Sequence, residues 1–479
     1  MTQAGRFGAV VLAAGAGSRF GGRKLLAPLN GRPVLGHVLE AIRAAGLSDT
    51  VVVLGHGAEA IESAIPWVAE RRVVNADPDA GLSSSLRVGF AALDPADLVG
   101  VFVVLGDQPQ VDPAVFDALR RAEVRAAVAF VVPRYLGGGG PNPVLVLRDG
   151  WPHVAAADGD RGLGPILATH PELVAEVELG GSNPDVDTAA DLAELAWADR
   201  VRRNRDQVDR HREVPDGPDF YGPMTGLFRA DPRRTDEPLL DALRALARPE
   251  DSWLDIGAGA GRYALPLALR VREVLAVEPS DGMRAALTEL MDQHGIVNVR
   301  VLADRWPPEP GSSAAQLRAD VALIANLGYD IEAIGPFIDS METAASRRCV
   351  AVLMDRQPSS IVDPFWPPIH GEERVALPAL PEFLDFLRAL GRRADVALYD
   401  RPPRGFDSLD ELHGFVRRQL WLAEGGRQDR RLRALLEQSA LEAAGRWSLP
   451  FGRTRIGLVS WTPAGAGSTT GADAAARTV

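Results

Sequence analysis

The stretch LAAGAGSRFGGRKLLAPLNGRPVL, residues 12–35, places a glycine-rich turn directly after a run of apolar residues. Gly15 and Gly17 allow the backbone to approach a bulky anion, and such a turn aims N–H groups at it. Arg19 and Lys24 add two cationic side chains. The stretch lacks the GxxxxGK[ST] pattern of the phosphate-binding P-loop. A tight strand-to-helix turn that merely carries surface cations is the alternative.

Lys24 is the only lysine of the chain, although lysine and arginine together occupy 52 of its 479 positions. A compact ammonium acts as a point charge between phosphate oxygens, whereas a guanidinium prefers a planar, forked contact. We therefore hypothesise that position 24 needs the shape of a lysine to hold a polyphosphate.

Composition limits the classes of function. The net charge is −12, which argues against nucleic-acid partners and against an anionic membrane surface. The single cysteine, Cys349, excludes a disulfide or a thiolate metal cluster within one chain. No apolar run reaches membrane-spanning length, and the first residues lack the pattern of a signal peptide. We expect a cytoplasmic protein that acts on small molecules, without nucleic-acid or membrane partners.

The apolar runs form two series. Residues 6–196 alternate strand candidates such as TVVVLG and GVFVVLG with amphipathic helical stretches, and a second series runs from Glu237 to Trp461. Continuous Val/Leu runs between helices are typical of parallel sheets covered on both faces. We therefore predict an α/β protein with two tandem Rossmann-like domains, each a mostly parallel sheet flanked by helices.

Charge and composition set the expected domain limits. Residues 197–223 are dense in charge and end in Pro and Gly, which is typical of a charged helical linker followed by a loop; a terminal helix of one domain fits equally. Small residues dominate from Gly465 onward, a composition typical of disorder. The expected organisation is a first domain at 1–198, a linker at 199–223, a second domain at 224–463 and a disordered tail at 464–479.

Further motifs follow the opening stretch in a fixed order. They are NADPDAGLSSSLRVGF (75–90), VVLGDQPQVD (103–112), GGPNPVLV (139–146), DGDRGLGPIL (158–167) and NPDVDTAADL (183–192). With the opening stretch, this set resembles the molybdenum-cofactor, or MobA-like, nucleotidyltransferases over most of residues 7–196. The resemblance implies transfer of a nucleoside monophosphate from an NTP to a phosphorylated acceptor, with release of pyrophosphate.

The resemblance also assigns roles to residues. It places Leu12, Ala13, Ala14 and Gly15 against the base and ribose, and Arg19 and Lys24 on the triphosphate. Asn75, Gly81 and Ser85 complete the nucleotide site. Ala14 stands where LAAG is typical of cytidylyl enzymes and LAGG of guanylyl enzymes, so CTP is the favoured substrate.

Two acids are the candidate ligands of Mg²⁺. Asp107 follows the apolar run GVFVVLG, so its carboxylate is expected at the carboxyl edge of the sheet, where ligands of α/β proteins bind. Asp187 resembles the family's second ligand, with Asp185 as a weaker option. One or two carboxylates plus phosphate oxygens suit Mg²⁺. The alternative role of Asp107 and Asp187 is to cap the helices that follow.

The acceptor is less well specified. Many relatives carry histidine where this chain has Asn142, near the expected acceptor site. The resemblance implies molybdopterin as the acceptor, and a molybdoenzyme or its maturation factors as protein partners. A sugar phosphate or polyol phosphate is the alternative acceptor.

A second glycine-rich motif, SWLDIGAGAGRYALPLAL, occupies residues 252–269. Arg262 stands where the dinucleotide fingerprint GxGxxG requires its last glycine. An acid ahead of the glycines suits a ligand with a positive amino group better than a pyrophosphate. The motif resembles class I S-adenosylmethionine-dependent methyltransferases over residues 237–463, and an NAD-binding domain is the alternative. The implied S-adenosylmethionine residues are Asp255, Gly257, Gly259, Gly261, Glu278 and Asp304.

The methyl acceptor has only candidate residues. Asn326 and Tyr329 lie in the loop that faces the reacting methyl group in this fold, and His370 is a possible base or simply a loop histidine. The whole chain is thus expected to be a bifunctional enzyme. A regulatory protein that senses nucleotide or S-adenosylmethionine with one inactive domain is the alternative.

Overall fold

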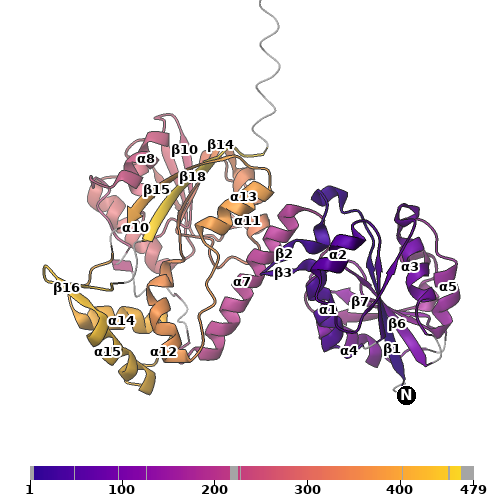
Figure 1. Cartoon of the computed structure of the whole chain (residues 1–479). Helices are drawn as coiled ribbons and strands as arrows, with labels where there is room; N and C mark the ends of the chain where they lie inside the picture. Colours follow the sequence, from indigo (N-terminus) through magenta and orange to yellow (C-terminus); the bar gives the residue numbers. More distant parts are fainter. Residues whose placement is uncertain are drawn as a thin grey trace, which may run out of the picture. The chain divides into compact units, whose positions relative to one another are not determined.

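The computed structural model describes residues 5–47, 49–94, 97–125, 127–215, 219, 225–226, 228–401, 403–450 and 454–464. Its contacts divide the chain into a first unit, Met1–Leu192, and a second unit, Ala193–Val479. Each unit is built on one seven-stranded sheet (Figure 1). The predicted class, two tandem Rossmann-like α/β domains, is confirmed.

The strands at the centre of the first unit's sheet are largely apolar and buried. Strand β8 alone runs antiparallel to its neighbours, β6 and β7, and the other pairs are parallel. In spatial order, the strands are β5 (Arg71–Val74), β4 (Asp49–Leu54), β1 (Arg6–Ala13), β6 (Leu98–Leu105), β8 (Val144–Leu147), β7 (Phe130–Tyr135) and β9 (Val174–Leu179).

Helices cover both faces of this sheet because each carries an apolar stripe. One face packs on α1 and α4, with Leu35, Leu39 and Phe116 fully buried. The other face packs on α3 and α5 through Leu86 and Val154. The helices of the unit are α1 (Val34–Ala44), α2 (Ala58–Ala64), α3 (Leu82–Ala91), α4 (Pro113–Arg121), α5 (Trp151–Ala155) and α6 (Gly164–Thr169); a small hairpin, β2 (Pro28–Leu29) and β3 (Arg32–Pro33), precedes α1.

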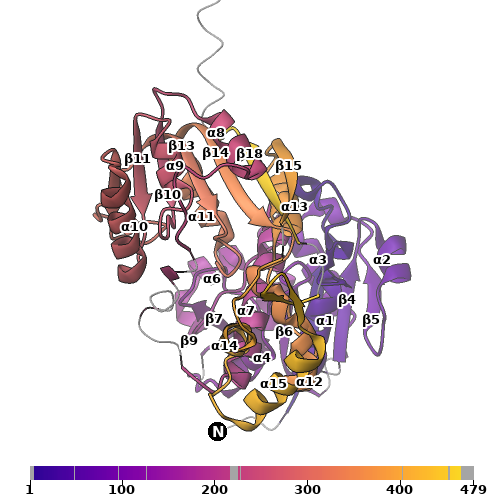
Figure 2. The same cartoon turned by 90° about the vertical axis from the view of Figure 1, so that its left-hand side faces the viewer.

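The second sheet contains five parallel strands followed by an antiparallel one. Strand β18 is antiparallel to both β14 and β15. Figure 2 shows most of these strands side by side. In spatial order they are β12 (Val299–Leu302), β11 (Glu273–Val277), β10 (Ser252–Ile256), β13 (Ala319–Ala325), β14 (Ala345–Met354), β18 (Thr454–Trp461) and β15 (Ala394–Arg401).

Two large hydrophobic cores and a small cluster of Ala260, Met283 and Ala286 lie in the described part of the second unit. The larger lies around the sheet, against α8 (Pro238–Leu246), α9 (Ala264–Ala268), α10 (Asp281–His294), α11 (Ile334–Ala344) and α13 (Leu380–Ala389). The smaller forms a helical lobe, seen together in Figure 1. Its elements are α12 (Trp366–His370), α14 (Leu409–Gln419), α15 (Arg427–Ser439), β16 (Leu441–Ala443) and β17 (Arg446–Ser448).

Helix α7 (Ala189–His211) begins in the first unit and continues in the second. Trp197 is buried there, and its indole Nε1 donates to the carbonyl of Ile331 at 2.8 Å. Residues 199–211, predicted as part of a charged helical linker, are helical, and Val201 and Val208 within them are buried in the cores of the second unit. The expected residues 216–218 and 220–223 of that linker, and all but the first residue of the expected tail, lie outside the described residues. No described helix is both long and apolar enough to cross a membrane.

Candidate active sites

The order of strands in the first unit creates a switch point beside β1. From β1 the chain moves outward to β4 and β5, and then returns to place β6 on the other side of β1. In open α/β sheets, ligands bind at the carboxyl edge at such a point. The two strand ends are linked there, because Gly106 N–H donates to the carbonyl of Leu12 at 2.9 Å. The glycine-rich turn after β1 and Asp107 after β6 therefore lie at the same edge.

Lys24 joins the two candidate metal ligands. Its Nζ lies 2.5 Å from Asp107 Oδ2 and 3.2 Å from Asp187 Oδ1. The lysine side chain is only 14% exposed, and the turn closes over it, since a Cβ at Gly17 would lie 3.2 Å from Lys24 Cβ. The left-handed φ of 59° at Gly17 favours glycine there as well. The single lysine is thus held between two acids that come from sequence positions far apart.

The electrostatics of this group favour a cation between the carboxylates. Burial lowers the pKa of Lys24, but the charges and hydrogen bonds of Asp107 and Asp187 outweigh that effect, and the net result is a raised pKa. Both carboxylates converge on one ammonium nitrogen, so the pair fits a divalent cation, which prefers oxygen ligands. Within the described residues, no group of three or more His, Cys, Asp or Glu side chains is arranged for a metal.

A buried amide network beneath the acids was missed by the sequence analysis. Gln108 Nε2 donates to Asp185 Oδ1 at 2.8 Å, and Asn183 Nδ2 donates to Gln108 Oε1 at 3.1 Å. Burial, followed by the charge of Asp107, raises the pKa of Asp185. Asp185 is therefore tied to the end of β6 through Gln108, while Asp187 faces Lys24. The position of Gln108 directly after Asp107 was the available signal.

The other residues predicted to bind nucleotide in the turn after β1 differ in their exposure to solvent. Leu12, Ala13 and Ala14 are buried at the end of β1, whereas Gly15 is exposed. Arg19, 79% exposed, contacts Asp187 Oδ2 at 3.3 Å. Its guanidinium is therefore the accessible cation of the turn.

Asn75, Gly81 and Ser85 form the scaffold of a loop. Asn75 Nδ2 donates to the hydroxyl oxygens of Ser84 at 2.7 Å and Ser85 at 2.9 Å, and all three side chains are buried. Gly81 has a φ of 93°, and a Cβ there would meet Asp160 Oδ1 at 2.5 Å. These residues fix the loop between β5 and α3 through internal contacts.

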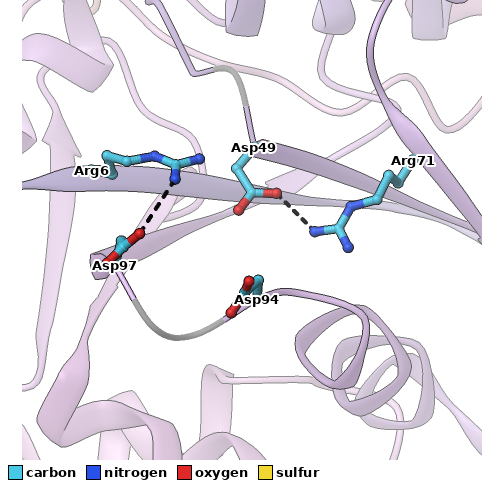
Figure 3. Close-up of a pocket in the computed structure, with 5 residues that line it drawn as sticks. All are labelled: Arg6, Asp49, Arg71, Asp94 and Asp97. Carbon is cyan, nitrogen blue, oxygen red and sulfur yellow. Dashed lines mark hydrogen bonds and ion pairs between the residues drawn. The ribbon is translucent and has the colours of Figure 1, made fainter.

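A pocket at the opposite edge of the sheet is a separate feature. Figure 3 shows its lining residues, Arg6, Asp49, Arg71, Asp94 and Asp97. Arg71 pairs with Asp49 at 2.8 Å, and Arg6 with Asp97 at 3.8 Å. Arg6, Asp49 and Arg71 begin β1, β4 and β5, so this pocket lies at the amino edge and is not the candidate active site.

The second unit repeats the switch-point geometry. From β10 the chain proceeds to β11 and β12 on one side, and then to β13 on the other. The glycine-rich turn after β10 has positive φ values at Gly257 (71°), Gly259 (54°) and Gly261 (82°). A Cβ at Gly261 would lie 2.4 Å from Leu287 Cδ1, whereas a Cβ at Gly259 would meet nothing within 4 Å. Gly261 is therefore needed for packing, and Gly259 borders open space.

Two buried acids flank this turn. Asp255 is 2% exposed, and its Oδ1 is buried without a hydrogen-bond partner. Burial, with the charge of Glu278, raises the pKa of Asp255 to about 7. The Glu278 carboxylate accepts from Gly259 N and from Ser280 N, each at 2.8 Å, which ties the ends of β10 and β11 together. A buried acid with an unused oxygen fits a ligand that carries a positive amino group.

Asp219, which the sequence analysis did not single out, adds a third carboxylate. It accepts from the hydroxyl of Ser280 at 2.9 Å and from Gly282 N at 3.1 Å, at the start of α10. Its charge contributes to raising the pKa of Glu278, after burial, which is the larger cause. No sequence signal marks Asp219, because it precedes the glycine-rich motif by more than thirty positions.

The other residues predicted to bind S-adenosylmethionine or the methyl acceptor have separate local environments. The carboxylate of Asp304 accepts hydrogen bonds from the loop that follows it, from Ser313 Oγ at 3.0 Å and from Ala314 N at 2.9 Å. Asn326 has a left-handed φ of 53° directly after β13. Tyr329 is buried, and its hydroxyl oxygen accepts from Met354 N at 2.7 Å. Burial raises the pKa of Tyr329 well above its usual range.

His370 lies in the helical lobe. Its ring stacks on Trp366 at 4.4 Å and on His211 at 4.5 Å between centroids. Burial, with the adjacent His211, lowers the pKa of His370 to about 4. This environment packs the histidine against the smaller core, away from the core of the sheet.

Comparisons with known proteins identify the first unit. The sequence profile of the MobA-like NTP transferase domain matches residues 9–174. The chain is 32% identical over 196 residues to nicotine blue oxidoreductase from Paenarthrobacter nicotinovorans, covering 39% of this chain and 94% of that protein. It is 38% identical over 129 residues to 2-C-methyl-D-erythritol 4-phosphate cytidylyltransferase from Cereibacter sphaeroides, covering 26% and 57%.

Among solved structures, Rv0371c from Mycobacterium tuberculosis H37Rv is 32% identical, with a TM-score of 0.36, covering 40% of this chain and 99% of that one. The chain spans 26% to 57% of the length of the first two curated relatives that it matches. The first unit is an α/β nucleotidyltransferase domain, and at the carboxyl edge of its sheet Lys24 and Arg19 are paired with acids. Through it, the chain belongs to the MobA-like NTP transferase family.

Proposed function

We propose that the chain is a bifunctional transferase. Its first unit would transfer a nucleoside monophosphate, with CMP favoured, from an NTP to a phosphorylated acceptor. An oxygen of the acceptor phosphate attacks the α-phosphorus, the bond from that phosphorus to the bridging oxygen breaks, and pyrophosphate leaves. The reaction needs the triphosphate charge neutralised and the two reactants aligned.

The observation that carries this proposal is the convergence of Lys24, Asp107 and Asp187 at the switch point. Asp107 and Asp187 would hold Mg²⁺, which neutralises phosphate charge when bound. Lys24 and Arg19 would then contact the phosphate oxygens, and Leu12–Gly15 would contact base and ribose. Ala14 supports CTP through its place in the motif, and a cytidylyltransferase is among the relatives.

Pyrophosphate release by the purified full-length chain tests this activity. CTP, GTP, ATP and UTP are each supplied with Mg²⁺ and with molybdopterin, a sugar phosphate or a polyol phosphate. We expect release with CTP and molybdopterin, and a loss of about a hundredfold or more in Asp107→Asn and Lys24→Ala. Arg121→Gln, on the exposed side of α4, is the matched control. Absence of release with every NTP contradicts the proposal, and release only with a sugar or polyol phosphate selects the alternative acceptor.

For the second unit we propose methyl transfer from S-adenosylmethionine to a small molecule. The supporting observation is Asp255, an acid beside the glycine-rich turn with one oxygen unpartnered. Asp255 and Glu278 fit the amino group and the ribose of this ligand, respectively, whereas a buried acid disfavours the pyrophosphate of NAD. Isothermal titration with S-adenosylmethionine and with NAD tests it. Binding of NAD in preference to S-adenosylmethionine would overturn the assignment.

A further inference from the structure

Contacts of Tyr329, Met354 and Arg401 connect the ends of three strands in the second sheet. Tyr329 follows β13, and its hydroxyl accepts from the N–H of Met354, the last residue of β14. Arg401, the last residue of β15, places its Nη1 2.9 Å from Met354 Sδ. Strands β13, β14 and β15 all run in one direction, so these contacts lie at the carboxyl edge. Arg401 therefore borders the same edge as the glycine-rich turn.

A second arginine, Arg404, packs over two aromatic rings. The guanidinium of Arg404 lies 5.2 Å from the ring centre of Phe415 and 5.8 Å from that of Phe406. Burial lowers the pKa of Arg404, and the like charges of Arg401 and Arg262 lower it further, against an opposing effect of Glu411. The charges of Arg401 and Arg262 thus act on Arg404, which follows Arg401 by three positions.

These cations differ in how they are neutralised. Arg262 pairs with both oxygens of Glu237, at 3.1 and 3.2 Å. In the described ranges of the chain, neither Arg401 nor Arg404 has an acidic group within ion-pair distance; their contacts are a sulfur atom and two rings. Guanidinium groups gathered without counter-ions are unfavourable unless an anion binds between them.

The opposite side of the same site carries the reverse charge. Asp255, Glu278 and Asp219 lie around the ends of β10 and β11, where the Glu278 carboxylate accepts from Gly259 N and the Asp219 carboxylate accepts from Gly282 N. That side suits the positively charged S-adenosylmethionine. The arginine side, across β13, suits a ligand of negative charge.

We propose that the methyl acceptor of the second unit is an anion whose carboxylate or phosphate group is bound by Arg401 and Arg404. This inference rests on the proposed methyltransferase function, since it assigns the substrate class of the same site. Guanidinium groups bind both kinds of oxyanion through charge-assisted hydrogen bonds. The aromatic rings beneath Arg404 hold its planar group in place.

Binding of simple probes to the full-length protein tests the proposal. The protein is saturated with S-adenosylhomocysteine, and phenyl phosphate, benzoate and the neutral analogues phenol and benzamide are titrated calorimetrically. We compare the wild type with Arg401→Gln/Arg404→Gln, and with Arg300→Gln on the exposed edge strand β12 as control. Because the first unit is the same in all three, differences between them report on the second unit.

We expect the double variant to weaken binding of an anionic probe by about tenfold or more, with the control unchanged. Phenyl phosphate and benzoate distinguish a phosphate acceptor from a carboxylate one. Equal anion affinity in wild type and double variant, or preference for the neutral probes, overturns the proposal. Failure of S-adenosylhomocysteine to bind the wild type instead overturns the methyltransferase assignment, and the anion titrations without it still decide whether the two arginines form an oxyanion site.

Discussion

Lys24 lies between Asp107 and Asp187, the two proposed metal ligands, so the proposed metal would compete with its ammonium group for these carboxylates. The ammonium pairs with both carboxylates, at 2.5 and 3.2 Å. If the proposed divalent ion binds these carboxylates, it displaces the ammonium, and the lysine can then contact the triphosphate. Metal and nucleotide should therefore bind cooperatively. The metal breaks the ion pairs of Lys24 with the two carboxylates, and the triphosphate gives the freed ammonium new partners.

The variant Lys24→Met measures this competition. We expect its affinity for Mn²⁺ in the absence of nucleotide to rise by about tenfold, since a like charge is removed from the site. Its affinity for CTP with metal should fall, because one phosphate-binding cation is lost. Calorimetric titration of Mn²⁺ provides the readout, with Arg121→Met, a 77% exposed side chain, as control. Unchanged Mn²⁺ affinity in Lys24→Met would show that the lysine does not compete.

Asp255 gives the second unit a pH dependence with a definite sign. Its folded-state pKa of about 7 lies above the usual value of 3.8, so the folded protein keeps a proton that the unfolded chain releases. The contribution of Asp255 to the free energy of unfolding therefore decreases as pH rises from about 4 to about 7, and stays constant above.

Asp255→Asn removes that dependence. We compare the free energy of unfolding of the variant with that of the wild type at each pH. This difference should favour the variant by about 3 kcal/mol more at pH 8 than at pH 4.5. Urea unfolding at the two pH values measures the difference, with the exposed Asp241→Asn as control. Binding of S-adenosylmethionine by the wild type should strengthen between pH 6 and 8, as Asp255 ionises, and lose this trend in the variant. If the difference in free energy of unfolding between the wild type and Asp255→Asn is the same at both pH values, the pKa of Asp255 is not raised.

At the scale of single elements, two glycines of the turn after β10 have different roles. Gly261 is needed for packing, whereas Gly259 borders the space where a ligand could bind. Gly261→Ala places a methyl group 2.4 Å from Leu287 Cδ1, so we expect it to lower the thermal midpoint strongly. Gly259→Ala meets no atom within 4 Å and should cost only about 1 kcal/mol for its left-handed backbone. The methyl group would, however, extend into the space next to Glu278, where the ligand is proposed to bind.

Thermal unfolding and S-adenosylmethionine titration together test this pair. Gly259→Ala should fold and bind at least about tenfold more weakly, a loss that backbone strain alone does not explain. Normal binding by a folded Gly259→Ala would show that the ligand does not approach this turn.

The same turn shows why sequence predicts some features and not others. Strands and glycine-rich turns are local patterns, so the two mostly parallel sheets and the turns after their strands followed from apolar runs and glycine spacing, whereas the strand order did not. Contacts between remote residues do not follow in this way. The apolar environment of His370 depends on α7, and Asp304 accepts hydrogen bonds from a loop ten residues away. The anionic partners that hold Lys24 were predicted as metal ligands, yet their direct contact with the lysine is visible only in three dimensions.

At the scale of the whole molecule, helix α7 decides where the second unit begins. Its charged residues made it resemble a linker, but several of them pair with groups on the same unit: Arg202 binds Glu332 at 2.8 Å, and Arg210 binds Glu372 at 3.3 Å. Charge density alone does not separate a solvated linker from a helix whose charges find partners. The buried face of α7 includes Trp197 and Val201, which belong to the core of the second sheet.

Two fragments test this boundary. A fragment of residues 189–479 contains all of α7, whereas one of residues 199–479 begins at the expected linker and lacks Trp197. Removing this indole, which is 3% exposed and hydrogen-bonded to Ile331, leaves a large void and an unpaired carbonyl. We expect the longer fragment to unfold cooperatively and the shorter one to lose several kcal/mol or aggregate.

A point variant separates the indole from the rest of the helix. In the full-length chain, Trp197→Ala should destabilise the second unit by about 3–5 kcal/mol, while Arg203→Ala on the exposed face should change it by less than about 0.5 kcal/mol. Pyrophosphate release by the first unit should persist in both, because residues beyond Leu192 belong to the second unit. If both fragments are equally stable and Trp197→Ala is neutral, then α7 is a linker after all, and the second unit begins where the charge pattern placed it.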